Sequence, residues 1–300
     1  MKLTPHTRIL ALLATCCAFA VAALAADSAA PAKKGGKKNS KTAPTTSAAS
    51  KAPVPLFDPG PSPTMGRKAP DTATILFDGT NMDAWAYHDE KDWLKPAGPV
   101  DWPIKDGVLT NIATKDTDLH RSIITKEQYG DFKFHAEVAT TETPTNAGFY
   151  LHSHYELKLL ETYGNPTPPS TGNFGNCDAG GPPKVNVSRP KEEWQTYDVE
   201  FHAPKFDADG NKIANARATV VVNGVKLYDN QELSNLRLAA AKIPENPRAP
   251  LQIKEHGNIV HYRNLWIIDM EKHPDDQTPI DGLPVADALA KAKEQSSHAQ

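Results

Sequence analysis

The sequence predicts an all-β protein that folds as a two-sheet antiparallel jelly-roll sandwich. Three observations support this fold class. Apolar and polar residues alternate in several short segments, turn dipeptides such as Asn-Gly and Asp-Gly separate these segments, and the helical period of 3.6 is nearly absent. The predicted domain covers residues 71–270, about 200 residues, which is long enough to bury one substantial core.

The predicted strands follow in chain order. Residues Phe132–Val138 and Tyr197–Phe201 alternate between apolar and polar side chains, as half-buried strands do. Residues Ala216–Val222 and Val225–Tyr228 flank an Asn-Gly dipeptide and predict a β-hairpin. A last strand is expected over Ile259–Ile268. Many short strands joined by Gly, Pro and Asn turns are typical of a sandwich.

The N-terminus has the pattern of a secretory signal peptide, residues 1–25. A basic start precedes an apolar run of about 16 residues, short of the roughly 20 that span a bilayer, and Ala23-Leu24-Ala25 fits a cleavage site. We expect export to the periplasm or the extracellular space, with no transmembrane span after cleavage. Lipoprotein processing before Cys16 is the lesser alternative. Cleavage after Ala25 leaves Cys177 as the one thiol, so no internal disulfide is expected.

Two polar segments flank the predicted domain. Residues 26–70 are rich in Ala, Pro, Lys, Ser and Thr, carry a net charge of +6, and predict a disordered linker with weak contact to anionic envelope polymers. Residues 271–300 form a polar tail, with a short helix expected over Ala286–Lys293. The whole chain has a net charge of -3, so its composition gives no support for a nucleic-acid partner.

Rows of ionisable side chains occur on predicted strand faces. In Leu151–Leu159 the alternation places four such side chains on one side: His152, His154, Glu156 and Lys158. Shorter rows occur at Lys254 with His256 and at His261 with Arg263. Such a row fits an exposed sheet face as well as the lining of a cleft. If these strands share a sheet, their side chains converge in a cleft suited to proton transfer and recognition of sugar hydroxyls.

Other chemistry is weakly indicated. The spacing of His152, His154 and Glu156 is also plain strand alternation, so no metal site is predicted. Residues Asp207–Asn211 resemble the start of a calcium loop, but Ala218 stands where that loop needs a Glu, and a hairpin turn is favoured. The sequence has no Gly-rich phosphate loop, and no cofactor is expected. The five tryptophans are assigned to core packing rather than to sugar stacking.

A series of short motifs then appears in a fixed order. They are Leu76–Asn81 leading to Trp85, Lys105–Leu109, Tyr129–Phe132, Asn146–Leu151, Tyr155-Glu156, Tyr163–Asn165, Pro182–Asn186, Ser188–Pro190, Glu193–Asp198, Phe206–Gly210, Val222–Val225, Glu255–Asn258 and Tyr262–Asn264. Over residues 71–270 the sequence thereby resembles the 3-keto-disaccharide hydrolase domain family. The resemblance implies a concanavalin A-like jelly roll of the lectin and glucanase type, and a carbohydrate substrate.

The resemblance also implies a reaction. A carbonyl at sugar C3 acidifies the hydrogen on C2, so that a base can remove it and the C1 substituent can leave before water adds. We expect Glu156 and His256 to carry the proton transfers. The expected substrate-binding residues are Asn146, His152, Lys158, Tyr163, Lys254 and Arg263, and a cation among them would stabilise the enolate oxygen.

The sequence departs from the family pattern at several of these positions. Family members usually carry Arg at the place of His152, Gln at those of Lys158 and Lys254, Tyr at that of Phe174 and Arg at that of His261. These changes leave the predicted fold unaffected and bear on the activity. The alternative to an enzyme is a non-catalytic, lectin-like carbohydrate-binding module of the cell envelope, and a structural or protein-binding role is a third possibility.

Overall fold

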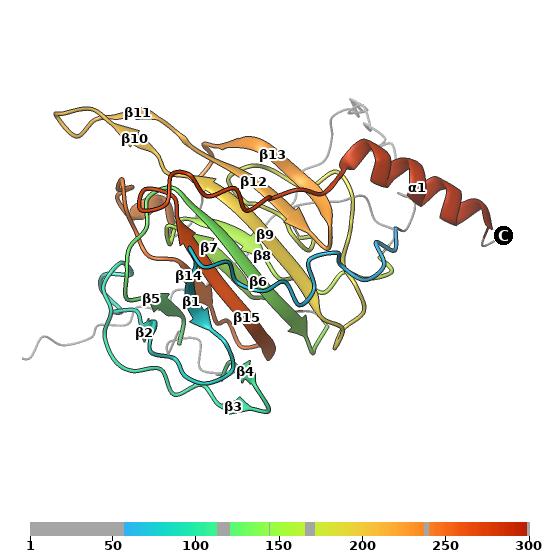
Figure 1. Ribbon diagram of the computed structural model, residues 1–300, viewed down its shortest axis with the longest axis horizontal. Coiled ribbons are helices and arrows are strands. Elements are labelled where there is room, and N and C mark those ends of the chain that lie inside the picture. The colour runs from blue at the N-terminus through green and yellow to red at the C-terminus, as the bar shows by residue number, and fades with distance from the viewer. Residues whose placement is uncertain (1–56, 113–120, 144, 166–171, 237–239, 299–300) are drawn as a thin grey trace, which may run out of the picture. The chain divides into compact units, whose positions relative to one another are not determined.

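The computed structural model describes residues 57–112, 121–143, 145–165, 172–236 and 240–298 (Figure 1). The expected signal peptide, the alternative lipoprotein site and most of the expected linker lie outside the described residues. Within the described part of the chain, no helix is long and apolar enough to cross a membrane.

The described residues form two large sheets, as the alternation predicted, and all their strand pairs are antiparallel except one short parallel pair at an edge of the larger sheet (Figure 1). The larger sheet has nine strands, in the order β16-β13-β12-β9-β6-β15-β4-β3, with β1 paired to β15. Their bounds are β1 Thr74–Phe77, β3 Ile104–Lys105, β4 Val108–Thr110, β6 Phe132–Thr140, β9 Gln195–His202, β12 Ala216–Val222, β13 Val225–Leu233, β15 Val260–Asp269 and β16 Leu283–Pro284.

The smaller sheet has five strands, in the order β2-β5-β14-β7-β8. Their bounds are β2 Trp85–Tyr87, β5 Ile123–Thr125, β14 Gln252–Lys254, β7 Gly148–Leu151 and β8 Tyr155–Lys158. A separate hairpin joins β10 Lys205–Phe206 to β11 Lys212–Ala214, and its turn contains the sequence that resembled a calcium loop. A short 3-10 helix follows at Ala240–Lys242.

The two sheets pack face to face around one apolar core. Phe149 of the five-stranded sheet contacts Phe134 and Tyr197 of the nine-stranded sheet edge-on, with ring centroids 5.1 and 5.6 Å apart. The Tyr197 hydroxyl also donates a hydrogen bond of 2.7 Å to the Lys158 carbonyl across the core. This arrangement is the predicted sandwich, and it leaves each sheet with one outer face.

The hairpin predicted at Asn223-Gly224 is confirmed. β12 and β13 pair with Val222 opposite Val225, and the two turn residues have φ angles of 50° and 78°. These positive angles fit the two-residue turn that matches the twist of paired strands, and Asn-Gly tolerates them best.

The outer face of the nine-stranded sheet is covered, although a half-buried strand was expected. Every residue of β6 is buried. Residues 57–68, which we call the covering segment, cross this face, and the Thr64 hydroxyl donates a 2.6 Å hydrogen bond to Asp198. The backbone N–H of Gly66 donates a 2.6 Å bond to Glu137. The expected linker over residues 26–70 is therefore too long at its C-terminal end, because these contacts fix the covering segment on the sheet.

The C-terminal segment also differs from a plain polar tail. Helix α1 spans Val285–His298, longer than the expected 286–293, and it contacts β13. Ala288 and Ala292 are fully buried, four residues apart on one helix face. Before the helix, Asp276 pairs with the buried Lys133 of β6 at 3.1 Å. The residues after β15 thus help to cover the same sheet face.

Candidate active site

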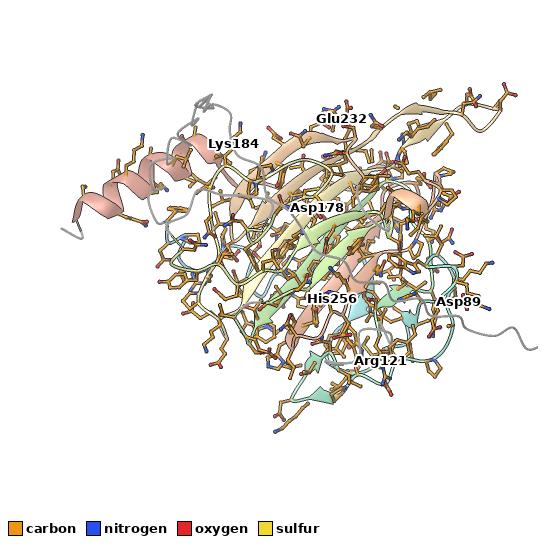
Figure 2. The ribbon with its side chains drawn as sticks, turned by 180° about the vertical axis from the view of Figure 1, so that it is seen from behind. Asp89, Arg121, Asp178, Lys184, Glu232 and His256 are labelled. Carbon is orange, nitrogen blue, oxygen red and sulfur yellow. The ribbon has the colours of Figure 1, made fainter. Side chains whose placement is uncertain are left out.

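A cavity of about 350 Å³ lies on the outer face of the five-stranded sheet. The strand residues that face the core, such as Tyr155, Leu157 and Ile253, alternate with residues that line the cavity. Figure 2, which shows the molecule from behind relative to Figure 1, labels Asp178 and His256 over the central strands. The ionisable and amide side chains of the lining include Asn146, His154, Glu156, Lys158, Asp178, Gln252, Lys254, Glu255 and His256.

The strand register explains why these side chains meet. Tyr150 of β7 pairs with Glu156 of β8 on one side and with Gln252 of β14 on the other. Two residues earlier in β7, Gly148 pairs with Lys158 of β8 on one side and with Lys254 of β14 on the other. Opposed residues in antiparallel strands point to the same face, so the two rows place a carboxylate and two ammonium groups together.

Glu156 is the charged centre of the cavity. Its carboxylate pairs with the Lys254 ammonium at 3.1 Å and lies 3.9 Å from the Lys158 ammonium. Lys254 also donates a 3.2 Å hydrogen bond to the side-chain oxygen of Asn146, and Lys158 pairs with Asp178 at 3.3 Å. Each ammonium is therefore held between two oxygen acceptors, and the carboxylate of Glu156, a residue that is 6% exposed, is fixed in orientation.

Gly148 makes room for this arrangement. A Cβ atom at this position would lie 2.9 Å from the Glu156 carboxylate oxygen and 3.0 Å from its Cγ. A side chain here would displace Glu156 or the backbone of β8. The glycine therefore leaves the space between the two lysines to the carboxylate.

Tyr150 and Gln252 add polar groups beside Glu156. Burial first, and then the Glu156 carboxylate, raise the pKa of Tyr150 well above its usual value of 10.0, so its hydroxyl stays protonated. The side-chain oxygen of Gln252 is buried and has no hydrogen-bond partner among the described residues. An unpaired buried acceptor in a cavity wall suits a ligand hydroxyl.

His256 lies at the rim of the cavity, two residues beyond β14, and is exposed. The loop that carries it is held by the buried Glu255, whose backbone N–H donates a 3.1 Å bond to the Ser122 hydroxyl. Gly257 turns the chain with a φ of 84° and donates its backbone N–H to the Glu255 carboxylate. The imidazole thus stands at the opening of the cavity that contains Glu156.

The structure does not bring His152 to the cavity. Residues 152–154 form a turn between β7 and β8, with φ angles of 53° and 55° at His152 and Ser153, so strand alternation stops there. The His152 ring is buried against Phe201, with ring centroids 4.7 Å apart, and donates a 3.1 Å bond to the Gly130 carbonyl. Burial lowers its pKa to about 4, so the ring is neutral in the core.

Arg263 and Tyr163 also lie outside the cavity lining. Arg263 belongs to β15 of the other sheet, where it donates a 2.7 Å hydrogen bond to Glu137 and stacks 4.0 Å from the Trp194 ring centroid. The expected convergence of Arg263 with Glu156 is therefore wrong. Tyr163 is half exposed. Of the eight residues expected at the site, the cavity brings together Asn146, Glu156, Lys158, Lys254 and His256.

Sequence reasoning missed Tyr150, Gln252, Asp178 and Trp93 of the cavity wall. The β7–β8 hairpin register would have pointed to Tyr150, and the alternation that selected Lys254 also selects Gln252. Asp178 and Trp93 lie in irregular segments, where no period marks the face of a residue. Trp85, Trp102 and Trp266 are buried, as the assignment to core packing expected. No cluster of His, Cys, Asp and Glu among the described residues has the arrangement of a metal site.

The described residues thus form a jelly-roll sandwich with a polar cavity on the outer face of one sheet, an architecture that lectins share with other classes of protein. Residues 72–268 match the 3-keto-alpha-glucoside-1,2-lyase-like domain, and the chain belongs to this family. None of the curated proteins matches the chain.

The solved structures to which this protein is similar include two candidate glycosyl hydrolases from Parabacteroides distasonis. One is 29% identical, with a TM-score of 0.57, and the match covers 67% of this chain and 85% of that one. The other is 21% identical with a TM-score of 0.47, covering 66% and 93%. The family and the first of these structures make residues 72–268 a glycosyl hydrolase-like, carbohydrate-active domain.

Proposed function

We propose that this protein cleaves 3-keto-disaccharides or 3-keto-glycosides in the cavity of the five-stranded sheet. The observation that carries the proposal is the Glu156 carboxylate, fixed at 3.1 Å from the Lys254 ammonium in the same cavity as His256. A carboxylate, an imidazole and two ammonium groups supply a base, an acid and charge stabilisation within one space.

The proposed reaction begins with removal of the proton on C2, which the neighbouring C3 carbonyl makes acidic. The electron pair moves toward the C3 oxygen and gives an enolate. When the enolate collapses, the bond between C1 and the glycosidic oxygen breaks, and that oxygen takes a proton as it leaves. Water then adds across C1 and C2, with hydroxyl bonding to C1 and the proton returning to C2, so no oxidant or cofactor is consumed.

Glu156 and His256 carry the proton transfers in this proposal. Lys158 and Lys254 stand beside the carboxylate and stabilise the negative charge that develops on the C3 oxygen. Tyr150 and Gln252 are placed to bond sugar hydroxyls, Tyr150 as a protonated hydroxyl and Gln252 through its unpaired oxygen. Arg263 has no part in this chemistry because it is bonded to Glu137 on the other sheet.

We further propose that the protein is exported, after removal of residues 1–25, to the periplasm or extracellular space. The basic start, the apolar run and the small residues before position 26 support this proposal. N-terminal sequencing of the protein recovered from the producing cell tests it. A mature N-terminus at residue 26 would support the proposal, and an intact Met1 in the cytoplasm would contradict it.

Turnover and binding by the mature chain test the activity. The chain from residue 26 is incubated with 3-keto-glucosides and with the corresponding ordinary glycosides, and both product release and binding heat are followed. We expect release of the aglycone from the 3-keto compounds alone. Binding without release from any of them would select a lectin-like module, and neither binding nor release would contradict a carbohydrate-directed role.

A further inference from the structure

A second hollow, of about 470 Å³, lies beside the cavity and shares His88 with it. We call it the side hollow. His88 follows β2, is 7% exposed, and its ring lies 5.7 Å from that of Trp93. Since Trp93 lines the cavity and His88 lines both spaces, this aromatic pair lies at the boundary of the two spaces, which we call the ridge. Figure 2 labels Asp89 and Arg121, which both line the side hollow, and His256, which lines the cavity.

The wall of the side hollow contains a cluster of polar groups. Arg121 donates a 2.7 Å hydrogen bond to the Tyr87 hydroxyl, and its guanidinium lies 4.8 Å from the Tyr87 ring centroid. Asp101 bonds to both of these residues. The Arg121 side chain is 31% exposed, so the cluster is held in place by its own contacts and still open to a ligand.

The side hollow has no excess of cations. Arg121 and Lys91 occur with two acidic lining residues, Asp89 and Glu90, and the Arg121 guanidinium is also paired with Asp101. Donors and acceptors without surplus positive charge suit a neutral ring that carries several hydroxyls, whereas a phosphate or uronate group would call for an excess of cations.

We propose that the side hollow binds the second sugar unit of the substrate, the one that leaves from C1. This inference rests on the proposed function, which places the keto sugar beside Glu156. A disaccharide whose keto ring fills the cavity would then pass its glycosidic oxygen over the ridge of His88 and Trp93. Tyr87 and Arg121 hold the hydroxyls of the leaving sugar, so they set the preference for a sugar over a small leaving group.

The test compares two substrates on the mature chain and on two variants, Arg121→Ala and Tyr87→Phe. One substrate is a 3-keto-α-glucosyl disaccharide and the other is methyl 3-keto-α-glucoside, whose leaving group cannot reach the side hollow. We expect kcat/KM for the disaccharide to fall about tenfold to a hundredfold in Arg121→Ala, the cost of one or two hydrogen bonds to a charged group. The methyl glucoside should change by less than about twofold, because it loses no contact. Arg217→Ala, at an exposed arginine of β12 bonded to Asn230, is the matched control.

An equal change on both substrates, or no change on the disaccharide, would overturn the inference. Thermal melting checks that Arg121→Ala is folded, and Tyr87→Phe repeats the test with a smaller change. If the wild-type chain turns over neither substrate, the proposed function fails while calorimetry still decides the inference. Tighter binding of the disaccharide than of the methyl glucoside, with the difference removed by Arg121→Ala, would support the side hollow. Equal binding would contradict it.

Discussion

The outer faces of the two sheets carry similar rows of charged side chains and use them differently. On the five-stranded sheet, Glu156, Lys158 and Lys254 line a cavity. On the nine-stranded sheet, Glu137 and Asp198 are 1% exposed beneath the covering segment. The difference arises because residues 57–68 cross the outer face of the nine-stranded sheet and bond directly to Asp198 and Glu137.

The row of Glu137 and Asp198 beneath the covering segment, which we call the covered row, behaves as a set of structural contacts. Asp198 accepts a 2.8 Å hydrogen bond from His135, a 2.6 Å bond from Thr64 and a 3.3 Å contact from Arg67. Burial alone would lower the pKa of His135, but its bonds to Asp198 and Glu137 raise it. Alternating charged residues on a strand therefore indicate an outer face, and the covering chain decides whether that face can bind a ligand.

The largest expected effect is the loss of turnover when Glu156 of the cavity is replaced. Glu156→Gln removes the carboxylate proposed to transfer protons, and we expect turnover of 3-keto-glycosides to fall about a thousandfold. Steady-state kinetics with matched thermal melts measure this. The control is Glu232→Gln, at an exposed carboxylate of β13 whose partners are Asn215 and Arg217. Turnover within about threefold of wild type in Glu156→Gln would contradict the assignment.

The covered row should affect stability instead of turnover. Asp198→Asn leaves Arg67 without this carboxylate and His135 with Glu137 alone, and we expect the free energy of unfolding to fall by about 3 kcal/mol. Urea denaturation measures the loss, while KM for the 3-keto substrate stays unchanged. A large rise in KM with normal stability would show that the two faces are not separate in function.

A smaller effect is expected at Gly148, between the two lysines. In Gly148→Ala the added Cβ would meet the Glu156 carboxylate oxygen at 2.9 Å, so the carboxylate must shift. We expect kcat to fall about tenfold, because a displaced catalytic group loses its alignment with the substrate. Kinetics that match wild type, in a folded variant, would contradict the role given to this glycine.

The smallest expected effect is a dependence of stability on pH that comes from His202, at the end of β9. Hydrogen bonds to Asp131 and then to Glu200 raise the pKa of His202 from 6.5 to about 9. The folded state thus holds this proton more tightly than the unfolded state. The stabilisation is fully present below pH 6.5 and is lost as the pH rises through about 9.

His202→Gln should remove this dependence of stability on pH. Melting temperatures of wild type and variant, followed from about pH 6 to about pH 10, should converge at the alkaline end. The difference should shrink in high salt, because His202 is half-buried and its ion pairs are screened. Parallel curves across the whole range would rule out this contribution.

Much of the fold was predictable from the sequence because strand alternation and Asn-Gly turns are local signals. The hairpin at Asn223-Gly224 and the sandwich follow from them. The turn at His152-Ser153 was not predictable, since it takes positive φ angles without the Gly or Asn that usually marks them.

The candidate site was predictable only where it lies on regular strands. Glu156, Lys158 and Lys254 were found by alternation, whereas Asp178 lies in an irregular segment. Arg263 was misplaced because a local pattern does not say which sheet a strand joins. That assignment depends on long-range pairing, here of β15 with β6.

Proton exchange at C2 of the sugar tests the central claim most directly. Methyl 3-keto-α-glucoside is incubated in D₂O with the mature chain, and the C2 hydrogen is followed by NMR. We predict that wild type accelerates exchange of deuterium into C2, and that both Glu156→Gln and a Glu156→Ala, His256→Ala double variant lose this acceleration while Asp198→Asn keeps it. Equal exchange by wild type and the double variant would contradict the claim that Glu156 and His256 abstract and return this proton.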